Sequence, residues 1–451
     1  MSRANPGEVS AGSAVPAWAE QVTPGTLDDP IRWQLVRDLF PLRSDLVHFD
    51  TATLGSVPVP ALEEFGRADR DYAARPADPY ERTALPEVRA ALARNYGCAV
   101  DEIALVNGGT DAMSRILGGL DLEPGDEIVT TTHECYTVRS PLNLLASRRG
   151  VVLRAVTPRS GPGLDAEEIV ATVEHAITPR TRVLQWAGVS LTTGVTFPTR
   201  LLAELAHAHG LITVVDGSLL AGQMPLNLHE LGVDFVGGAL SKYQCGPMGT
   251  GLLYARNRVL PDYNPTPLPP FWPVVSLAYP VEGQLPPRAQ GAEPAYDLGL
   301  MLQQSDVADL SRSAALMHCV RMWERIGWEN VQWYVFGLSA YLKQRIAEIW
   351  GRGALLTPAD DDRLHSGIVA FEPFHGRHES AGPGRYLAFR DRLAADHGVT
   401  VQVTAVPVQG VPNPRFAIRL APHLYNTRGE IDQALDAMVL LGEELASPAA
   451  E

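Results

Sequence analysis

Lysine is the scarcest charged residue of this chain, and its other scarcities exclude several classes of protein. Only Lys242 and Lys343 are lysines among the 37 basic residues, and the rest are arginines. The 52 acidic residues give a formal net charge of −15, which argues against a nucleic-acid partner and against attraction to an anionic membrane surface. No uninterrupted apolar run reaches about 18 residues, so we expect no membrane-spanning helix.

Cysteine is also scarce. The four cysteines are scattered and form no C-x-x-C pair: Cys98, Cys135, Cys245 and Cys319. We therefore expect neither a metal site nor a disulfide framework. The chain opens without the basic and apolar regions of a secretory signal, so the default expectation is a reducing cytoplasm.

The length of 451 residues exceeds what one compact core accommodates, which predicts two lobes and an appendage. Residues 1–28 are rich in Pro, Gly, Ala and Ser, and we interpret them as a mobile tail. We expect residues 29–60 to form a segment that packs on a small C-terminal domain over 306–451. A large domain is expected over 61–305.

Apolar strand-like runs alternate with helical runs in the large domain. The predicted strands cover residues 102–106, 127–131, 151–156, 182–187, 211–215 and 235–237. Such alternation predicts a mainly parallel sheet with helices on both faces. Sheets of this kind carry their chemistry in the loops beyond the carboxyl ends of the strands.

The strongest local signal joins Asp216 and Lys242. Asp216 ends the buried run LITVVD, and Lys242 follows 26 positions later, before a glycine-rich stretch. A carboxylate at a buried strand end is costly unless it pairs with a cation. A protonated pyridinium nitrogen is such a cation, and a partly desolvated lysine can form an imine through its neutral amine.

A second signal is Gly108-Gly109-Thr110, in ALVNGGTDAM. A predicted strand ends at these glycines and a helix begins at Thr110, so exposed backbone amides and a hydroxyl are available to a phosphate. Gly-Gly-Thr is also an ordinary helix start, which keeps a purely structural interpretation open.

These blocks resemble those of fold-type I enzymes that use pyridoxal 5'-phosphate (PLP), in the class V aminotransferase group. The similarity covers residues 47–440 and is greatest to the isopenicillin N epimerase-like branch. That branch includes sulfoxide C–S lyases of ergothioneine biosynthesis and enzymes that tailor S-cysteinyl sugars of lincosamide antibiotics. The spacing from Lys242 to Gly246-Pro247 fits this branch, because cysteine desulfurases typically have one residue fewer there.

The resemblance implies an α/β fold like that of aspartate aminotransferase, with a mainly parallel sheet between helices and a smaller α+β C-terminal domain. It also implies a homodimer with composite active sites. The matched positions carry these roles: Lys242 as the catalytic Schiff-base lysine, Asp216 at the pyridinium nitrogen, Gly109 and Thr110 at the phosphate, His133 stacked on the ring and catalytic, and Ser241 as a further phosphate donor.

The C-terminal block RFAIRLAPHLYNT resembles the block whose arginine binds the substrate α-carboxylate. Arg419 is the candidate for this clamp and Arg415 is a poor second. A planar guanidinium binds a carboxylate bidentately, which suits the role. A structural salt bridge near the C-terminus is the alternative.

Three positions depart from the family pattern. Leu191 and Leu219 stand where relatives often have polar partners of the cofactor phenolic oxygen. Gly291-Ala292-Glu293 lacks the hydroxyl that relatives send to the neighbouring subunit's phosphate. In addition, no cysteine follows Cys319, whereas cysteine desulfurases carry a mobile cysteine some 15 residues before the matching arginine. Persulfide chemistry is therefore disfavoured.

The preferred reaction is β-elimination that cleaves the C–S bond of a cysteine S-conjugate, in antibiotic or small-thiol biosynthesis. The alternative is O2-dependent decarboxylation with oxidative deamination of a similar conjugate. Epimerisation or transamination is the third possibility. A binding protein that has lost catalysis is a remote further option, because Lys242, Asp216 and Arg419 are all present. Phe271 and Trp272 are candidates for a substrate pocket or for simple packing of a Pro-rich loop.

Overall fold

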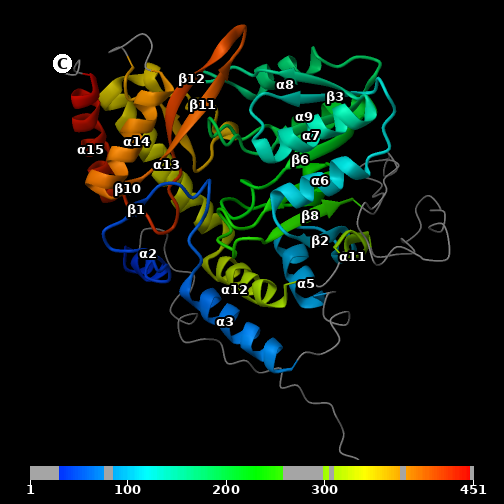
Figure 1. Cartoon of the computed structure of the whole chain (residues 1–451), viewed down its shortest axis with the longest axis horizontal. Coiled ribbons are helices and arrows are strands. Elements are labelled where there is room, and N and C mark those ends of the chain that lie inside the picture. Colours follow the sequence, from blue (N-terminus) through cyan, green and yellow to red (C-terminus); the bar gives the residue numbers. More distant parts are fainter. Residues whose placement is uncertain (1–29, 76–84, 257–297, 304–308, 376–381, 447–451) are drawn as a thin grey trace, which may run out of the picture.

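The computed structural model describes residues 30–75, 85–256, 298–303, 309–375 and 382–446, which form two lobes (Figure 1). The predicted tail, Phe271, Trp272 and the segment Gly291 to Glu293 lie outside these residues. None of the described helices is both long enough and apolar enough to cross a membrane.

The large lobe is built on a seven-stranded sheet in the order β2-β8-β7-β6-β5-β3-β4. Its strands are β2 (Ile103–Val106), β3 (Glu127–Thr131), β4 (Val152–Val156), β5 (Thr181–Ala187), β6 (Ile212–Asp216), β7 (Phe235–Ala239) and β8 (Gly251–Ala255). Only β8 runs antiparallel to its neighbours, β2 and β7. The sheet is mainly parallel, as the sequence predicts; β8 is a strand that the sequence pattern did not single out.

Neighbouring residues of each strand point to opposite faces, and both faces are buried. Val214 and Phe235 belong to one apolar cluster with α6 (Gly109–Gly119) and α7 (Tyr136–Arg149). Val215 and Val236 belong to another with α8 (Ala166–Glu174) and α9 (Thr199–Ala208). Continuous apolar runs are therefore required, and helices cover both faces of the sheet. This arrangement confirms the predicted α/β fold class.

Further helices complete the large lobe and connect it to the small one. They are α3 (Val59–Ala74), α5 (Pro86–Asn95), α10 (Leu228–Leu231), α11 (Leu298–Gln303) and α12 (Leu310–Ile326). Helix α3 lies against α12 at the lower edge of the molecule (Figure 1). The long helix α13 (Trp328–Trp350) begins directly after α12 and enters the small lobe.

The small lobe carries an antiparallel sheet in the order β11-β12-β9, formed by β11 (Gln402–Val408), β12 (Val411–Leu420) and β9 (Val369–Phe371). Helices α13, α14 (Pro383–His397) and α15 (Arg428–Ala446) cover it. The N-terminal segment contributes α2 (Pro30–Arg37) and β1 (Val47–His48). Strand β1 pairs in parallel with β10 (Val399–Thr400). This pairing fastens the segment to the small lobe.

A stretch of the small lobe over residues 357–367 docks on the large lobe. Thr357 Oγ1 donates to the Thr193 carbonyl (2.6 Å), and Ser366 Oγ donates to the Gly194 carbonyl (2.7 Å). The Tyr243 hydroxyl donates to the Gly367 carbonyl (3.0 Å). Tyr243 follows Lys242 directly, so this contact ties the lysine segment to the small lobe.

Alanine substitutions at two glycines of the N-terminal region should have opposite effects on the stability of the protein. A Cβ at Gly55 would overlap the Lys242 carbonyl oxygen, so Gly55→Ala should lower the free energy of unfolding by about 1–3 kcal/mol. Gly66 lies inside α3, where a Cβ would meet only the end of Arg70 at 3.4 Å. Gly66→Ala should raise the same quantity by about 0.5–1 kcal/mol. Urea unfolding measures both; equal stability of Gly55→Ala and wild type would contradict the close approach.

Candidate active site

Asp216 and Lys242 come from neighbouring strands. Asp216 is the last residue of β6 and pairs in register with Gly237 of β7; Lys242 lies three positions beyond β7. The Asp216 side chain is largely buried and its Oδ1 accepts a hydrogen bond from the Ser218 amide (2.9 Å). Within the described residues, no lysine or arginine pairs with this carboxylate. Asp216 is therefore a buried anion available to a cation.

The Lys242 side chain is half-buried and makes no hydrogen bond or ion pair with the described residues. Its backbone is held tightly instead. The Lys242 carbonyl accepts from the Cys245 amide (3.0 Å), and Cys245 has a positive φ of 54°. Lys343 differs, because its Nζ donates to the Pro358 carbonyl (2.8 Å) and burial lowers its pKa to about 8. Of the two lysines, Lys242 has the available amine.

Helix α6 begins beside the same strand ends. Its N-cap, Gly108, has a φ of 110°, and a Cβ at Gly109 would lie 2.8 Å from Ser218 Oγ. Ser218 Oγ also accepts from the Ala239 amide (3.0 Å) at the end of β7. Thr110 is exposed in the first helical turn. The start of α6 thus meets the loop after Asp216, and Ser218 is a polar residue that sequence reasoning missed.

Ser241 is half-buried at the end of the same β7 loop. Its carbonyl accepts a hydrogen bond from the Gly55 amide (2.9 Å). The N-terminal segment therefore reaches the residue immediately before Lys242.

His133 lies in the loop after β3 and is fully buried. Nδ1 is 3.2 Å from Ser190 Oγ and 3.3 Å from Thr193 Oγ1, and Nε2 is 3.3 Å from the Pro158 carbonyl. Because a carbonyl only accepts, Nε2 carries the proton in this arrangement. Burial lowers the pKa of His133 to about 4, so the ring is neutral near pH 7.

The two residues after His133, Glu134 and Cys135, were given no role in the site from the sequence. Burial raises the pKa of Glu134 to about 7, and the nearby Asp216 carboxylate raises it too. Burial and Asp216 also raise the pKa of the Cys135 thiol, while Lys242 lowers it. Cys135 therefore lies within electrostatic reach of both Asp216 and Lys242. The sequence signal that could have identified Glu134 and Cys135 was their position directly after His133, in the loop at the end of β3.

Glu134 is held by three donors. Oε1 accepts from the Thr131 hydroxyl and the Ala187 amide (both 2.8 Å), and Oε2 accepts from Gln185 Nε2 (2.9 Å). Ala187 pairs in register with Asp216. The carboxyl group of Glu134 consequently reaches the backbone directly opposite Asp216.

Arg419, on β12, is almost fully buried. Nη2 donates to Asp50 Oδ1 and to Thr53 Oγ1 (2.7 Å), and Nη1 donates to the Leu191 carbonyl (3.2 Å). Nε is buried and has no partner among the described residues. Arg415, four positions earlier in the exposed part of β12, instead pairs with Glu372. Arg419 therefore combines features of the two roles considered from the sequence. It forms a structural salt bridge, and it keeps one unused donor that could bind a substrate carboxylate.

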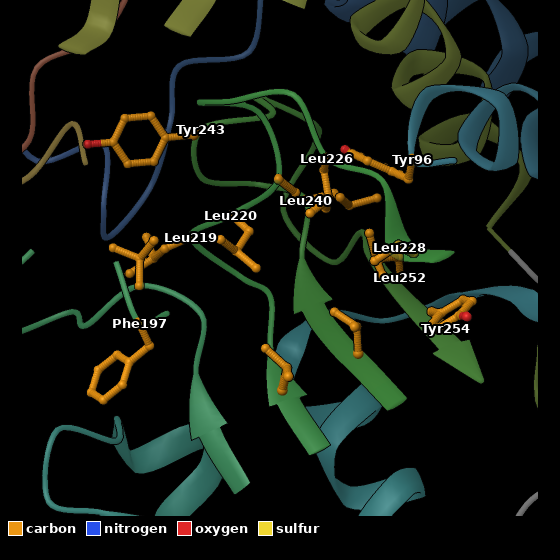
Figure 2. Close-up of a cluster of buried hydrophobic side chains, with 14 of the residues drawn as sticks. Tyr96, Phe197, Leu219, Leu220, Leu226, Leu228, Leu240, Tyr243, Leu252 and Tyr254 are labelled. Carbon is orange, nitrogen blue, oxygen red and sulfur yellow. The ribbon is translucent and has the colours of Figure 1, made fainter. Parts of the chain in front are cut away.

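One side of the site is apolar. Leu219 is 3% exposed and belongs to the cluster of buried side chains that also contains Leu220 and Tyr243 (Figure 2). Leu191 packs against the same cluster with its side chain, so only its carbonyl serves Arg419. Ser190 and Thr193, polar residues on either side of Leu191 in the sequence, are engaged with His133.

The place of the mobile desulfurase cysteine is occupied by regular structure. Fifteen positions before Arg419 stands Thr404, which lies within β11 and pairs with Ala417 of β12. A cavity of about 560 Å³ separates this hairpin from the large lobe. Four threonines line it, Thr130, Thr131, Thr132 and Thr157, together with Arg139 and Asn143 of α7 and the apolar tip of the hairpin. Its volume is typical of small-molecule sites.

Comparison with known proteins identifies the family. The pattern of the Aminotransferase class-V family matches residues 77–269. Isopenicillin N epimerase of Streptomyces clavuligerus is 31% identical over 420 residues, which cover 91% of this chain and 99% of that protein. This chain belongs to the class-V aminotransferase family. Enzymes of this family use PLP, and the chain is a PLP-dependent enzyme.

Other relatives of this class-V enzyme agree in fold. A probable cysteine desulfurase of Mycobacterium leprae is 27% identical over 435 residues, and the chain spans 65% of its length. The cysteine desulfurase structure from Thermococcus onnurineus superposes with a TM-score of 0.70 at 22% identity, over 91% of this chain and 98% of that one. The cystine C-S lyase C-DES, solved with cysteine persulfide, gives 0.69 at 21% identity, over 90% and 99%.

The residues present fit PLP. A buried Asp216 with a single backbone donor suits a protonated ring nitrogen. The glycine start of α6, where Gly109 approaches Ser218, offers backbone amides and hydroxyls to a phosphate. Lys242 has an amine without a partner among the described residues.

The two lysines make the attachment site directly testable. Borohydride reduction of the holoenzyme should fix PLP on the peptide that contains Lys242, because its amine is available. Lys242→Ala should abolish both this label and the cofactor absorbance band at about 420 nm. Lys343→Met is the matched control and should keep both, since Lys343 serves only the Pro358 carbonyl. A label that persists in Lys242→Ala would refute the assignment.

Glu134 predicts a distinctive pH dependence of stability. Its folded pKa of about 7 lies above the ordinary 4.5, so the stability it contributes is complete below pH 4.5 and is lost as the pH rises through 7. Glu134→Gln should therefore gain stability relative to wild type across this window, by about 3 kcal/mol at most. The Gln185 amide can rotate to accept from the new amide group.

Urea unfolding at pH 4.5, 6 and 7.5 measures this difference. Glu123→Gln, the same change at an exposed position, should show no such trend. A pH-independent difference for Glu134→Gln would mean that Glu134 is ionised throughout.

Proposed function

We propose that this enzyme holds PLP on Lys242 and cleaves the C–S bond of an S-substituted cysteine. One observation carries the proposal: Lys242 has an amine without a partner among the described residues, Asp216 is a buried carboxylate at the neighbouring strand end, and Arg419 is a buried arginine whose Nε is unused. Such a set suits an amino acid held by its carboxylate with its α-carbon near the lysine. The similarity to an isopenicillin N epimerase supports an amino-acid substrate.

The residues divide the work as follows. Asp216 would hold the ring nitrogen, and Gly109, Thr110, Ser218 and Ser241 would hold the phosphate. His133 stays neutral near pH 7, because burial lowers its pKa to about 4. When bound, PLP supplies the electron sink for a bond broken at the substrate α-carbon. Arg419 binds the substrate carboxylate through Nε. The Lys242 amine would take the α-proton as general base.

The elimination is balanced with water as the only co-reactant. The substrate loses its α-proton to Lys242, the Cβ–S bond breaks, and sulfur leaves with the bonding electron pair as a thiolate. Hydrolysis of the remaining three-carbon fragment gives pyruvate and ammonium. No persulfide step is required, which agrees with Thr404 in place of a mobile cysteine.

A second reaction is favoured by one specific contact. Asp50 already neutralises Arg419, so a substrate carboxylate would be held weakly and could leave as CO2. With one O2 and one water, the conjugate then gives an aldehyde, CO2, ammonia and hydrogen peroxide. The apolar side formed by Leu219 supports this route, because it excludes water from the reacting carbon.

The cavity beside the β11–β12 hairpin is the proposed site for the sulfur substituent. Thr132, Thr157, Asn143 and the guanidinium of Arg139 suit a hydroxylated group such as a sugar. Arg139 makes no ion pair within the described part of the chain. This chemistry supports a role in secondary metabolism or small-thiol biosynthesis. We also propose a homodimer, on the strength of the family resemblance.

Product analysis separates the two reactions. With S-methyl-L-cysteine, elimination should release pyruvate and methanethiol in a one-to-one ratio, at the same rate in air and under argon. The decarboxylating route should instead consume O2 and release CO2 without pyruvate. Arg419→Met should reduce kcat/KM by about 100-fold on either route, through the lost carboxylate contact. Pyruvate release by Lys242→Ala at the wild-type rate would contradict proton abstraction by Lys242.

A further inference from the structure

The proposed carboxylate clamp is already occupied by a carboxylate of the protein itself. Arg419 Nη2 donates both to Asp50 Oδ1 and to Thr53 Oγ1, and Nη1 donates to the Leu191 carbonyl. Nε is buried without a partner. The edge that a guanidinium offers to a bidentate carboxylate, Nε with Nη2, is therefore half in use.

Asp50 is fixed in this position by its backbone. The residue forms a bridge with Ala421, two positions beyond Arg419 on the same side of the small lobe. The Ala421 amide donates to the Phe49 carbonyl (2.7 Å), and the hydroxyls of Thr51 and Tyr425 lie 2.5 Å apart. Exposure of the Asp50 side chain is 13%. The pair is thus a built and largely desolvated feature, unlike an exposed ion pair on a flexible surface.

The same loop connects the pair to the lysine. Asp50 begins a turn in which Thr53 Oγ1 donates back to Asp50 Oδ1 (2.9 Å). Two residues later, the Gly55 amide donates to the Ser241 carbonyl (2.9 Å), and Gly55 packs on Lys242. Asp50 therefore belongs to the wall of the site in which Lys242 stands.

We propose that Asp50 is a specificity-determining residue that weakens the selection of an α-carboxylate by Arg419. A substrate carboxylate must share a guanidinium that Asp50 already neutralises, and the two anions repel each other in a region with little water. The α-carboxylate then contributes less to substrate binding than it would with an unshared guanidinium, so the enzyme discriminates less strongly against amines without a carboxylate. This inference rests on the proposed function, because it requires the substrate amine to reach Lys242.

The test compares two probes that differ only in the carboxylate. S-methyl-L-cysteine and 2-(methylsulfanyl)ethylamine are titrated into the holoenzyme, and dissociation constants are read from the cofactor absorbance. In Asp50→Asn, the constant for S-methyl-L-cysteine should fall about tenfold, while that for the amine changes less than about twofold. Asp45→Asn is the matched control, because Asp45 pairs with Arg43 on the exposed surface, and it should change neither constant.

Each other outcome is decisive. Weaker binding of S-methyl-L-cysteine to Asp50→Asn, or an unchanged ratio of the two constants, would overturn the inference and make Asp50 an orienting partner of Arg419. If neither probe alters the absorbance of wild type, the proposed function fails and the inference with it. Should Asp50→Asn not fold, Thr53→Val frees one N–H of Nη2 and should tighten only S-methyl-L-cysteine, by about two- to threefold; an unchanged ratio there would also overturn the inference.

Discussion

The structure must hold Lys242 in place without giving its amine a side-chain partner, and it does this through contacts of the Lys242 backbone and of the residue that follows it. Gly55 approaches so closely that a Cβ would overlap the Lys242 carbonyl. The Tyr243 hydroxyl reaches the Gly367 carbonyl, and His423 Nε2 donates to the Tyr243 carbonyl (2.7 Å). Three distant parts of the chain therefore meet at one turn. An ion pair would have fixed Lys242 more simply but would have consumed the amine.

The second constraint is the parallel sheet, which brings the other groups to that turn. Strands β6 and β7 are parallel neighbours in this sheet, so their carboxyl ends bring Asp216 and Lys242 to the same edge. The start of α6 fits beside them because Gly109 allows the approach of Ser218. The small lobe then adds Arg419 through β12, and the contacts of Thr357 and Ser366 keep the two lobes in register.

The sequence was most informative where a pattern is local. Alternating apolar runs predicted β3 and β6 almost to the residue, because strands buried on both faces must be continuously apolar. Strand β8 was not predicted, and its antiparallel direction could not be inferred from its amino-acid composition. Contacts between residues far apart in the chain were also invisible. Nothing in the sequence pairs Asp50 with Arg419, since the partners lie 369 positions apart.

Residues within recognised blocks were missed for a different reason. Ser218 and Glu134 are ordinary polar residues whose roles depend on which strand end they face, and that requires the sheet order. Cys135 was considered only as a metal ligand or disulfide partner, and the sequence alone did not reveal its electrostatic interaction with Asp216 and Lys242. Conversely, the predicted stacking role of His133 remains a prediction, because the structure shows a ring whose two nitrogens are both engaged.

The charges of the site explain why Asp50 matters. Burial keeps His133 neutral near pH 7 and holds Glu134 near its midpoint. The remaining charged groups are two cations, Lys242 and Arg419, and two anions, Asp216 and Asp50. The protein side is therefore close to neutral before any substrate arrives. A substrate carboxylate adds an excess negative charge, so its affinity depends on how strongly the Asp50 carboxylate repels it and competes for Arg419. An enzyme that only had to grip amino acids would gain from a neutral residue at position 50. The buried carboxylate there is consistent with chemistry in which the substrate carboxylate is meant to be held loosely.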